Sequence, residues 1–226
     1  MTHFIRNFSA SLAITMGLFG CEGDPATVEP THEKAASPQT SPSDSSSSAP
    51  ARVAAAQMVF DASDEGASLV SLGIPSKATA AYYRSLPNDL LAARAKSGEV
   101  MAKAFLVERL AMDGLTLQRA RKKNGRLPNN ISDADLVADL GRISMELAPL
   151  LQDTNNAFAA YLWGMYMSAA SYEGAYEPIV AGIRLAGLRG DPRASEIEQQ
   201  FLTQHPGLDA SLIENHFERG RRELIR

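Results

Sequence analysis

A regular spacing of apolar residues between positions 136 and 150 constrains the fold of this chain more than any other feature. Its members recur at intervals of four, three, four and three residues: Leu136, Leu140, Ile143, Leu147 and Leu150. This spacing places all five side chains on one face of an α-helix. Ser132 precedes the series in the position of a helix N-cap, and Asp135 follows three residues later, as in a capping box. We therefore expect a helix that begins after Ser132.

The rest of the chain from about residue 56 to residue 226 also carries helical periods and lacks the alternating runs that mark strands. Further helices are expected to begin at Asp191-Pro192, an N-cap followed by proline, and near Asp209. Three segments are apolar on most faces and should lie between neighbouring helices: 99–113, 156–172 and 177–188. Breaks are expected at Gly98, Gly114, residues 123–128, Gly174, Gly190 and Pro206-Gly207. The sequence thus predicts an all-α fold of eight or nine helices joined by short turns.

The first twenty-one residues have the character of an export signal. Arg6 is followed by a mostly apolar run, Phe8 to Gly20, which is too short to span a bilayer and has the length of a secretory signal core. The run ends at Leu18-Phe19-Gly20-Cys21, and Cys21 is the one cysteine of the chain. A single cysteine excludes an intramolecular disulfide and a cysteine-based zinc cluster.

This ending resembles the signal of bacterial lipoproteins. Leu18, Gly20 and Cys21 match the family pattern, and Phe19 is bulkier than the residue usual at its position. The resemblance implies that residues 1–20 are removed and that Cys21 becomes a lipid-bearing N-terminus. In that family an aspartate after the cysteine directs retention in the inner membrane, whereas Glu22 stands here. The implied location is the bacterial cell envelope, anchored in the outer membrane and facing the periplasm.

Residues 21–55 differ in composition from the rest of the chain. Prolines and serines, including the run Ser45 to Ser48, fill this segment, and large apolar residues are almost absent. Such a composition buries too little apolar surface to order the chain. We expect a disordered tether that spans roughly 30 Å as a flexible coil, followed by a helical domain over residues 56–226.

Three turn-then-helix segments in the helical domain are similar to one another. They start near Ser97-Gly98, Thr154-Asn155 and Arg189-Gly190, and each places a small residue early in the following helix. The pattern resembles Sel1-like repeats, relatives of the tetratricopeptide family, which implies antiparallel helix hairpins stacked as a short solenoid. The starts are 57 and 35 residues apart, and the family glycine is Asn155 in the middle copy. A helical bundle without repeats is an equal alternative.

The sequence offers few signs of catalysis. It contains no glycine-rich phosphate loop, paired-histidine zinc motif, paired-cysteine motif or nucleophile elbow, so no cofactor and no metal are expected. The helical domain holds two histidines, His205 and His216, for which surface positions are the simpler interpretation. Glu173 and Glu177 flank a turn and could serve as the acid and base of a glycan-cleaving enzyme; the alternative is a turn whose acids favour a helix N-terminus.

Two groups of side chains are candidates for binding a partner. The first comprises Trp163 and Tyr166 of an aromatic segment that also holds Tyr161 and Tyr172; it is either an exposed anchor surface or part of the core. The second is a run of cations before a turn: Arg119, Arg121, Lys122, Lys123 and Arg126. A further basic group closes the chain: Arg219, Arg221, Arg222 and Arg226. If the two basic groups met, they would form a patch for an acidic partner or for acidic lipid headgroups.

Overall charge restricts the choice of partner. The chain carries 22 basic and 26 acidic side chains, a net charge of −4, which argues against nucleic acid. The sequence therefore favours a lipid-anchored, periplasm-facing helical module that binds a protein, as an adaptor or assembly factor, and is not an enzyme. Two alternatives are an immunity-type inhibitor of a toxin and the glycan-cleaving enzyme.

Overall fold

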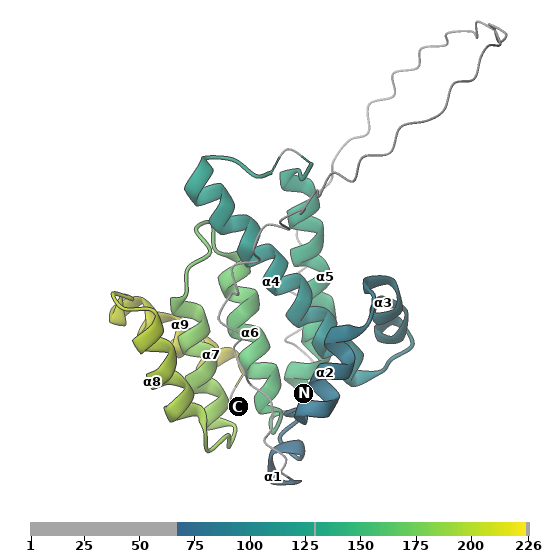
Figure 1. Ribbon diagram of the computed structural model, residues 1–226. Helices are drawn as coiled ribbons and strands as arrows, with labels where there is room; N and C mark the ends of the chain where they lie inside the picture. The colour runs from purple at the N-terminus through teal and green to yellow at the C-terminus, as the bar shows by residue number, and fades with distance from the viewer. Residues whose placement is uncertain (1–66, 129, 225–226) are drawn as a thin grey trace, which may run out of the picture. The chain divides into compact units, whose positions relative to one another are not determined.

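Helices are the regular elements that this sequence forms, as its periodicity predicts. A computed structural model describes residues 67–128 and 130–224. The predicted signal peptide, Cys21, the tether and the start of the helical domain at residue 56 lie outside these residues. Within the described residues there are nine helices and no strand (Figure 1). They are α1 (Ala67–Val70), α2 (Lys77–Ser85), α3 (Asn88–Lys96), α4 (Val100–Asn124), α5 (Asp133–Gln152), α6 (Ala157–Ala170), α7 (Glu177–Leu188), α8 (Ala194–Gln204) and α9 (Ala210–Leu224).

The predicted start of α5 is confirmed. The Ser132 hydroxyl accepts a hydrogen bond from the backbone N–H of Asp135 at 3.2 Å, and the Asp135 carboxylate accepts one from the backbone N–H of Ser132 at 2.9 Å. These reciprocal bonds form a capping box. The Asp209 carboxylate likewise accepts hydrogen bonds from the backbone N–H groups of Ser211 and Leu212, which confirms the predicted start of α9.

Five of the predicted breaks are confirmed, and one is wrong. A glycine with φ between +60° and +99° occupies each confirmed break: Gly98, Gly125, Gly174, Gly190 and Gly207. Gly114 instead lies inside α4, which continues for 25 residues. A Cβ atom at Gly114 would lie 3.2 Å from the Cβ of Ala169. The missing side chain therefore admits α6 against α4 and does not end the helix.

The predicted N-cap at Asp191 is also wrong. α8 begins at Ala194, after two turn residues, and Arg193 occupies its N-cap position. The Asp191 side chain is buried and accepts a hydrogen bond from the Tyr161 hydroxyl at 2.7 Å. The Arg193 guanidinium binds the same carboxylate at 3.0 Å. Burial raises the pKa of Asp191, but the hydrogen bonds from Arg193 and Tyr161 outweigh it and leave the pKa below its ordinary value. Asp191 thus joins α6 to the turn before α8.

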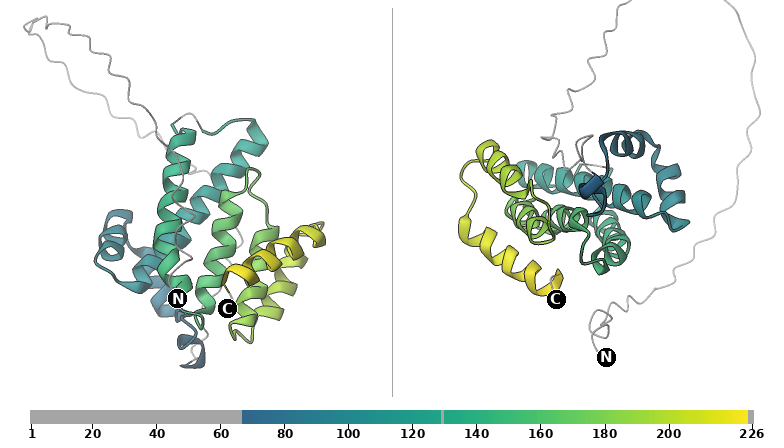
Figure 2. Two further views of the ribbon diagram at one scale, coloured as in Figure 1. Left: turned by 180° about the vertical axis from the view of Figure 1, so that it is seen from behind. Right: turned by 90° about the horizontal axis from the view of Figure 1, so that it is seen from below.

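Two central helices organise the packing. α6 contacts α4, α5 and α7, and α7 contacts α8 and α9 as well (Figure 2). α2 and α3 pack against α4. The antiparallel hairpins α4–α5 and α6–α7 lie beside one another, whereas α8 and α9 both pack on α7. The resemblance to Sel1-like repeats stays a prediction. None of the described helices is both long and apolar enough to cross a lipid bilayer.

Two glycines bring the backbones of α6 and α7 into contact. A Cβ atom at Gly182 would lie 2.8 Å from the carbonyl oxygen of Ala160 and 2.8 Å from the Cα of Gly164. A Cβ atom at Gly164 would lie 2.8 Å from the carbonyl oxygen of Pro178. Both helices are buried over most of their length. Close approach of their backbones therefore sets the geometry of the core.

Candidate partner-binding site at the end of α4

The last turns of α4 and the facing turn between α6 and α7 form a surface that we call the basic corner. It is defined by Arg119, Arg121, Lys122, Lys123, Arg126 and Tyr172. The cations gather here because α4 ends at Gly125, and positive charge is favourable at a helix C-terminus. Five of the six residues form the predicted basic group. The structure adds Tyr172 to them.

Arg119 holds the basic corner together. Its guanidinium lies 3.3 Å from the ring centroid of Tyr176 and donates hydrogen bonds to the Tyr176 hydroxyl and to the carbonyl oxygen of Gly174. Burial lowers the pKa of Arg119 to about 10, so the side chain is charged at neutral pH. Arg119 therefore fastens the α6–α7 turn onto α4.

Arg121 and Lys122 form ion pairs across the corner. The Arg121 side chain is 14% exposed, pairs with Asp133 at the start of α5, and lies 5.2 Å from the ring centroid of Tyr172. Lys122 pairs with Glu173 at 2.6 Å, with both side chains more than half exposed. An exposed pair of this kind contributes at most about 1 kcal/mol to stability. A carboxylate of a partner could therefore replace Glu173 at little cost.

Lys123 and Arg126 are the cations of the basic corner whose charge faces solvent. Both are exposed, and neither forms an ion pair with any residue that the structure describes. Tyr172, which lines the same pocket as Arg126, is 72% exposed. Arginine and tyrosine are enriched among the residues that dominate protein–protein binding energy. The exposed cations can pair with an acidic side chain of a partner, and Tyr172 can contact an apolar or aromatic side chain of the same partner.

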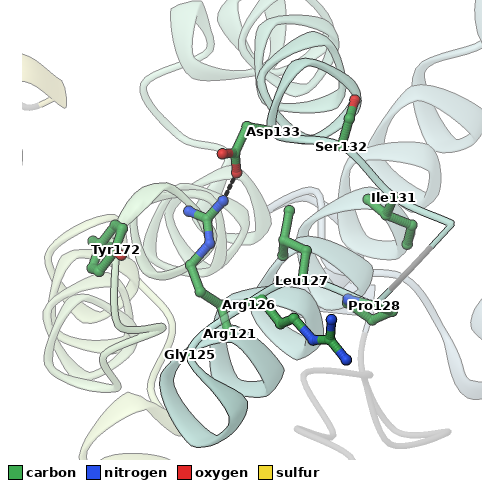
Figure 3. Close-up of a pocket in the computed structure, with 9 residues that line it drawn as sticks. All are labelled: Arg121, Gly125, Arg126, Leu127, Pro128, Ile131, Ser132, Asp133 and Tyr172. Atoms are coloured by element: carbon green, nitrogen blue, oxygen red, sulfur yellow. Dashed lines mark ion pairs between the residues drawn. The ribbon is translucent and has the colours of Figure 1, made fainter.

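A pocket of about 430 Å³ lies between the end of α4 and the start of α5. Figure 3 shows Arg121 reaching across it to Asp133, with Tyr172 at one side. Arg126 and Ser132 also line it. Its polar lining and open mouth suit a charged side chain of a bound protein. The chemistry of the pocket and the exposed cations point to the same kind of ligand, a carboxylate.

The predicted aromatic candidates lie elsewhere, and this corrects the proposal that Trp163 is an exposed anchor. Trp163 is 3% exposed, and its indole lies against Gly220 of α9, where an added Cβ would come within 2.8 Å of the ring. Tyr166 is half-buried and packs against the core. Tyr172 lies in the turn after α6, which ends at Ala170. Trp163 therefore stabilises the fold and offers no surface to a partner.

The two predicted enzyme carboxylates have separate partners. Glu173 pairs with Lys122, whereas the Glu177 carboxylate accepts a hydrogen bond from the backbone N–H of Asp209 at 3.3 Å. Glu177 also lies in the first turn of α7, where negative charge is favourable. Among the described residues, no three metal-binding side chains gather at one place. Glu177 thus lies at a helix N-terminus, as the turn interpretation describes, and Glu173 lies in an ion pair across the basic corner.

The two predicted basic groups lie at opposite ends of α6. Arg119 binds the turn after α6, whereas the end of α9 meets the start of α6 through Arg189, which bonds to the carbonyl oxygens of Leu224 and Asn156. α6 has 14 residues, a length of about 21 Å. A joint patch of Arg219, Arg221 and Arg222 with the basic corner is therefore excluded; Arg226 lies outside the described residues.

Comparisons with protein-family models, with curated proteins and with solved structures give no significant match. The geometry of the chain's own residues therefore carries the functional argument.

Proposed function

We propose that this chain is a lipid-anchored interaction module of the bacterial cell envelope. It faces the periplasm, is held in the outer membrane through Cys21, and binds an acidic segment of a protein partner at the basic corner. It acts as an adaptor or assembly factor and catalyses no reaction. The observation that carries this proposal is the exposed charge of Lys123 and Arg126 at the end of α4, next to a polar pocket that Arg126 and exposed Tyr172 both line.

The mixed charge of the corner favours a protein over a lipid surface as its ligand. Adsorption to anionic lipid gains from an unbroken basic face, but Asp133 and Glu173 stand among the cations here. When a partner's carboxylate replaces Glu173 in its exposed ion pair with Lys122, one ion pair is lost as another forms, so the exchange adds specificity more than affinity. A protein segment with spaced acids and an aromatic or aliphatic side chain fits this arrangement best.

Charge reversal tests the assignment of the surface. Lys123→Glu with Arg126→Glu is expected to weaken partner binding by roughly tenfold or more, because two cations that attract the partner then repel it. Arg221→Glu with Arg222→Glu changes the net charge equally at the far end of α6 and is the matched control. Binding is measured as recovery of the partner after cross-linking in cells, with the tagged full-length chain at equal abundance.

Equal loss with both pairs of substitutions would show that only net charge matters and would contradict the assignment. Binding of anionic lipid vesicles that the corner substitutions abolish, with partner recovery unchanged, would assign the corner to the membrane surface instead. If the partner kills cells that lack this chain, the module is an inhibitor of a toxin.

Replacement of the lipid-bearing cysteine tests the anchor. Cys21→Ala is expected to move the protein from the membrane fraction to the soluble periplasmic fraction, because the residue that would carry the acyl chains is gone. Fractionation of cells that express each form measures this directly. Cys21→Ala protein that stays with the membrane at the level of the unaltered chain would contradict lipid anchoring through this residue.

A further inference from the structure

Four side chains, from α4, from the residue before α7 and from the end of α8, form a stack beside the basic corner, which we call the His205 stack. It consists of Arg119, Tyr176, His205 and Phe201. The centroid of the His205 ring lies 4.1 Å from that of Tyr176 and 4.5 Å from that of Phe201. Arg119 covers Tyr176 at 3.3 Å. The stack thus joins the basic corner on α4 to the end of α8.

The imidazole in this stack is suited only to the neutral form. The Nε2 atom of His205 is buried and has no hydrogen-bond partner among the residues that the structure describes. A protonated imidazole carries a hydrogen-bond donor at both nitrogens, and a buried donor without an acceptor is costly. Protonation of His205 would also place a second positive charge near the Arg119 guanidinium. Both effects oppose protonation while the stack is closed.

Within residues 67–128 and 130–224, the charged groups around His205 supply no compensating anion. On α4 the charged group is Arg119, whose charge lowers the pKa of His205. Just before α7 the titratable group is the Tyr176 phenol. The neighbouring Glu177 carboxylate accepts a hydrogen bond from the backbone N–H of Asp209. The Asp209 carboxylate itself binds Ser211. On α9, burial and then the charge of Arg219 lower the pKa of His216, and the charge of Glu177 opposes them.

We infer that the His205 stack is a pH-sensitive device that opens when His205 is protonated and then strengthens binding of acidic partners at the basic corner. The inference rests on the proposed function, whose regulation it describes. Opening exposes the imidazolium and loosens the contact that buries Arg119. The corner then presents an additional positive charge, and less of the existing charge is shielded by packing. Affinity for an acidic segment should therefore rise as the pH falls.

The sign of the associated change in stability follows from the same residues. Burial, and after it the charge of Arg119, lowers the pKa of His205 below its ordinary value of 6.5. A histidine with a lowered pKa stabilises the fold fully above about pH 6.5, and this contribution falls as the pH drops from there through the folded-state pKa. In mildly acidic conditions, protonation of His205 therefore lowers the stability of the packing at the end of α8 and adds positive charge at the basic corner.

The test uses the full-length chain in detergent micelles and a rhodamine-labelled peptide of six aspartates, which stays ionised from pH 5.5 to 7.5. The peptide's affinity, measured by fluorescence anisotropy, is expected to rise roughly threefold to tenfold between pH 7.5 and pH 5.5. His205→Phe keeps an aromatic ring in the stack that does not titrate, so the peptide affinity of this variant should change little between pH 7.5 and pH 5.5. His205→Gln serves as a second variant should the first fold poorly, and His216→Gln is the matched control that should keep the pH dependence.

A side-chain NMR titration of the Arg119 Nε–H in the same proteins separates the two proposals. We expect the chemical shift of the Arg119 Nε–H to change with pH in the unaltered chain and not to change in His205→Phe. If His205→Phe retains the full change in affinity, the device is contradicted although the corner still binds. If the peptide binds at neither pH, the proposed function and its regulation both fail, and the Arg119 signal alone decides whether the stack opens. An Arg119 signal that does not change between pH 7.5 and 5.5 would overturn the opening itself.

Discussion

Alanine at position 182 is expected to lower the free energy of unfolding by about 3 kcal/mol. The added Cβ would lie 2.8 Å from the carbonyl oxygen of Ala160 and 2.8 Å from the Cα of Gly164. Both are backbone atoms, so no rotation of a side chain relieves the overlap, and α6 and α7 must move apart. The gain in helix propensity from glycine to alanine, about 1 kcal/mol, does not offset this loss.

The same substitution at Gly141 is the matched control. Gly141 lies within α5, and an added Cβ would meet nothing within 4 Å. Gly141→Ala is therefore expected to stabilise the protein by about 0.5–1 kcal/mol. Urea unfolding, followed by the fluorescence of the single tryptophan, Trp163, measures the free energy of unfolding of both variants. Gly182→Ala protein as stable as the unaltered chain would contradict the backbone contact between α6 and α7.

Methionine in place of Arg189 is expected to cost about 3–5 kcal/mol of stability. Arg189 is 6% exposed, and its guanidinium donates to the carbonyl oxygens of Leu151, Asp153, Asn156 and Leu224. These acceptors lie at the end of α5, at the start of α6 and at the end of α9. Methionine keeps much of the packing volume but leaves all four carbonyl groups without this donor, including the buried ones of Asn156 and Leu224.

Two further variants show whether this effect arises from the guanidinium. Arg189→Lys keeps the charge but cannot span four acceptors with one ammonium group, so it should recover only part of the loss. Arg219→Met, at an exposed ion pair with Glu223, should change stability by less than about 0.5 kcal/mol. Thermal unfolding gives the comparison, and an Arg189→Met protein no less stable than Arg219→Met would contradict the role of Arg189.

Local signals in the sequence were sufficient to place several helix boundaries. Ser132 and Asp135 specify the start of α5 because both halves of a capping box lie within four residues. Gly114 could not be interpreted in this way. A glycine inside a helix and a glycine that ends one have the same local sequence signal, and what distinguishes them is Ala169, 55 residues away.

Burial of the aromatic residues was not predictable for a related reason. α6 is apolar on nearly all sides, so its periodicity does not tell which face is exposed. Trp163 is covered by α9, whose position depends on packing against α7. The basic corner was predictable as a run of cations along one helix. Its partners come from two other segments, Asp133 from the start of α5 and Glu173 and Tyr176 from the α6–α7 turn, and no spacing in the sequence links them.

The His205 stack shows the same limit at a site that bears on function. Arg119 and His205 are separated by 86 positions in the chain, and neither belongs to a recognisable motif. Their proximity results from the α6–α7 turn, which is held by Arg119 on one side and by α8 on the other through the contact of Tyr176 with Phe201. Such a cluster can be found only once the helices are placed.

Site-specific photo-cross-linking in cells tests the central claim most directly. A photoreactive amino acid in place of exposed Tyr172 should capture one protein partner at the basic corner, and Lys123→Glu with Arg126→Glu should abolish that capture. The same amino acid in place of Leu188, which is 55% exposed at the other end of α7, should not capture this partner. Equal capture from both positions, or capture at Tyr172 that the charge reversal leaves unchanged, would contradict the basic corner as the partner-binding surface.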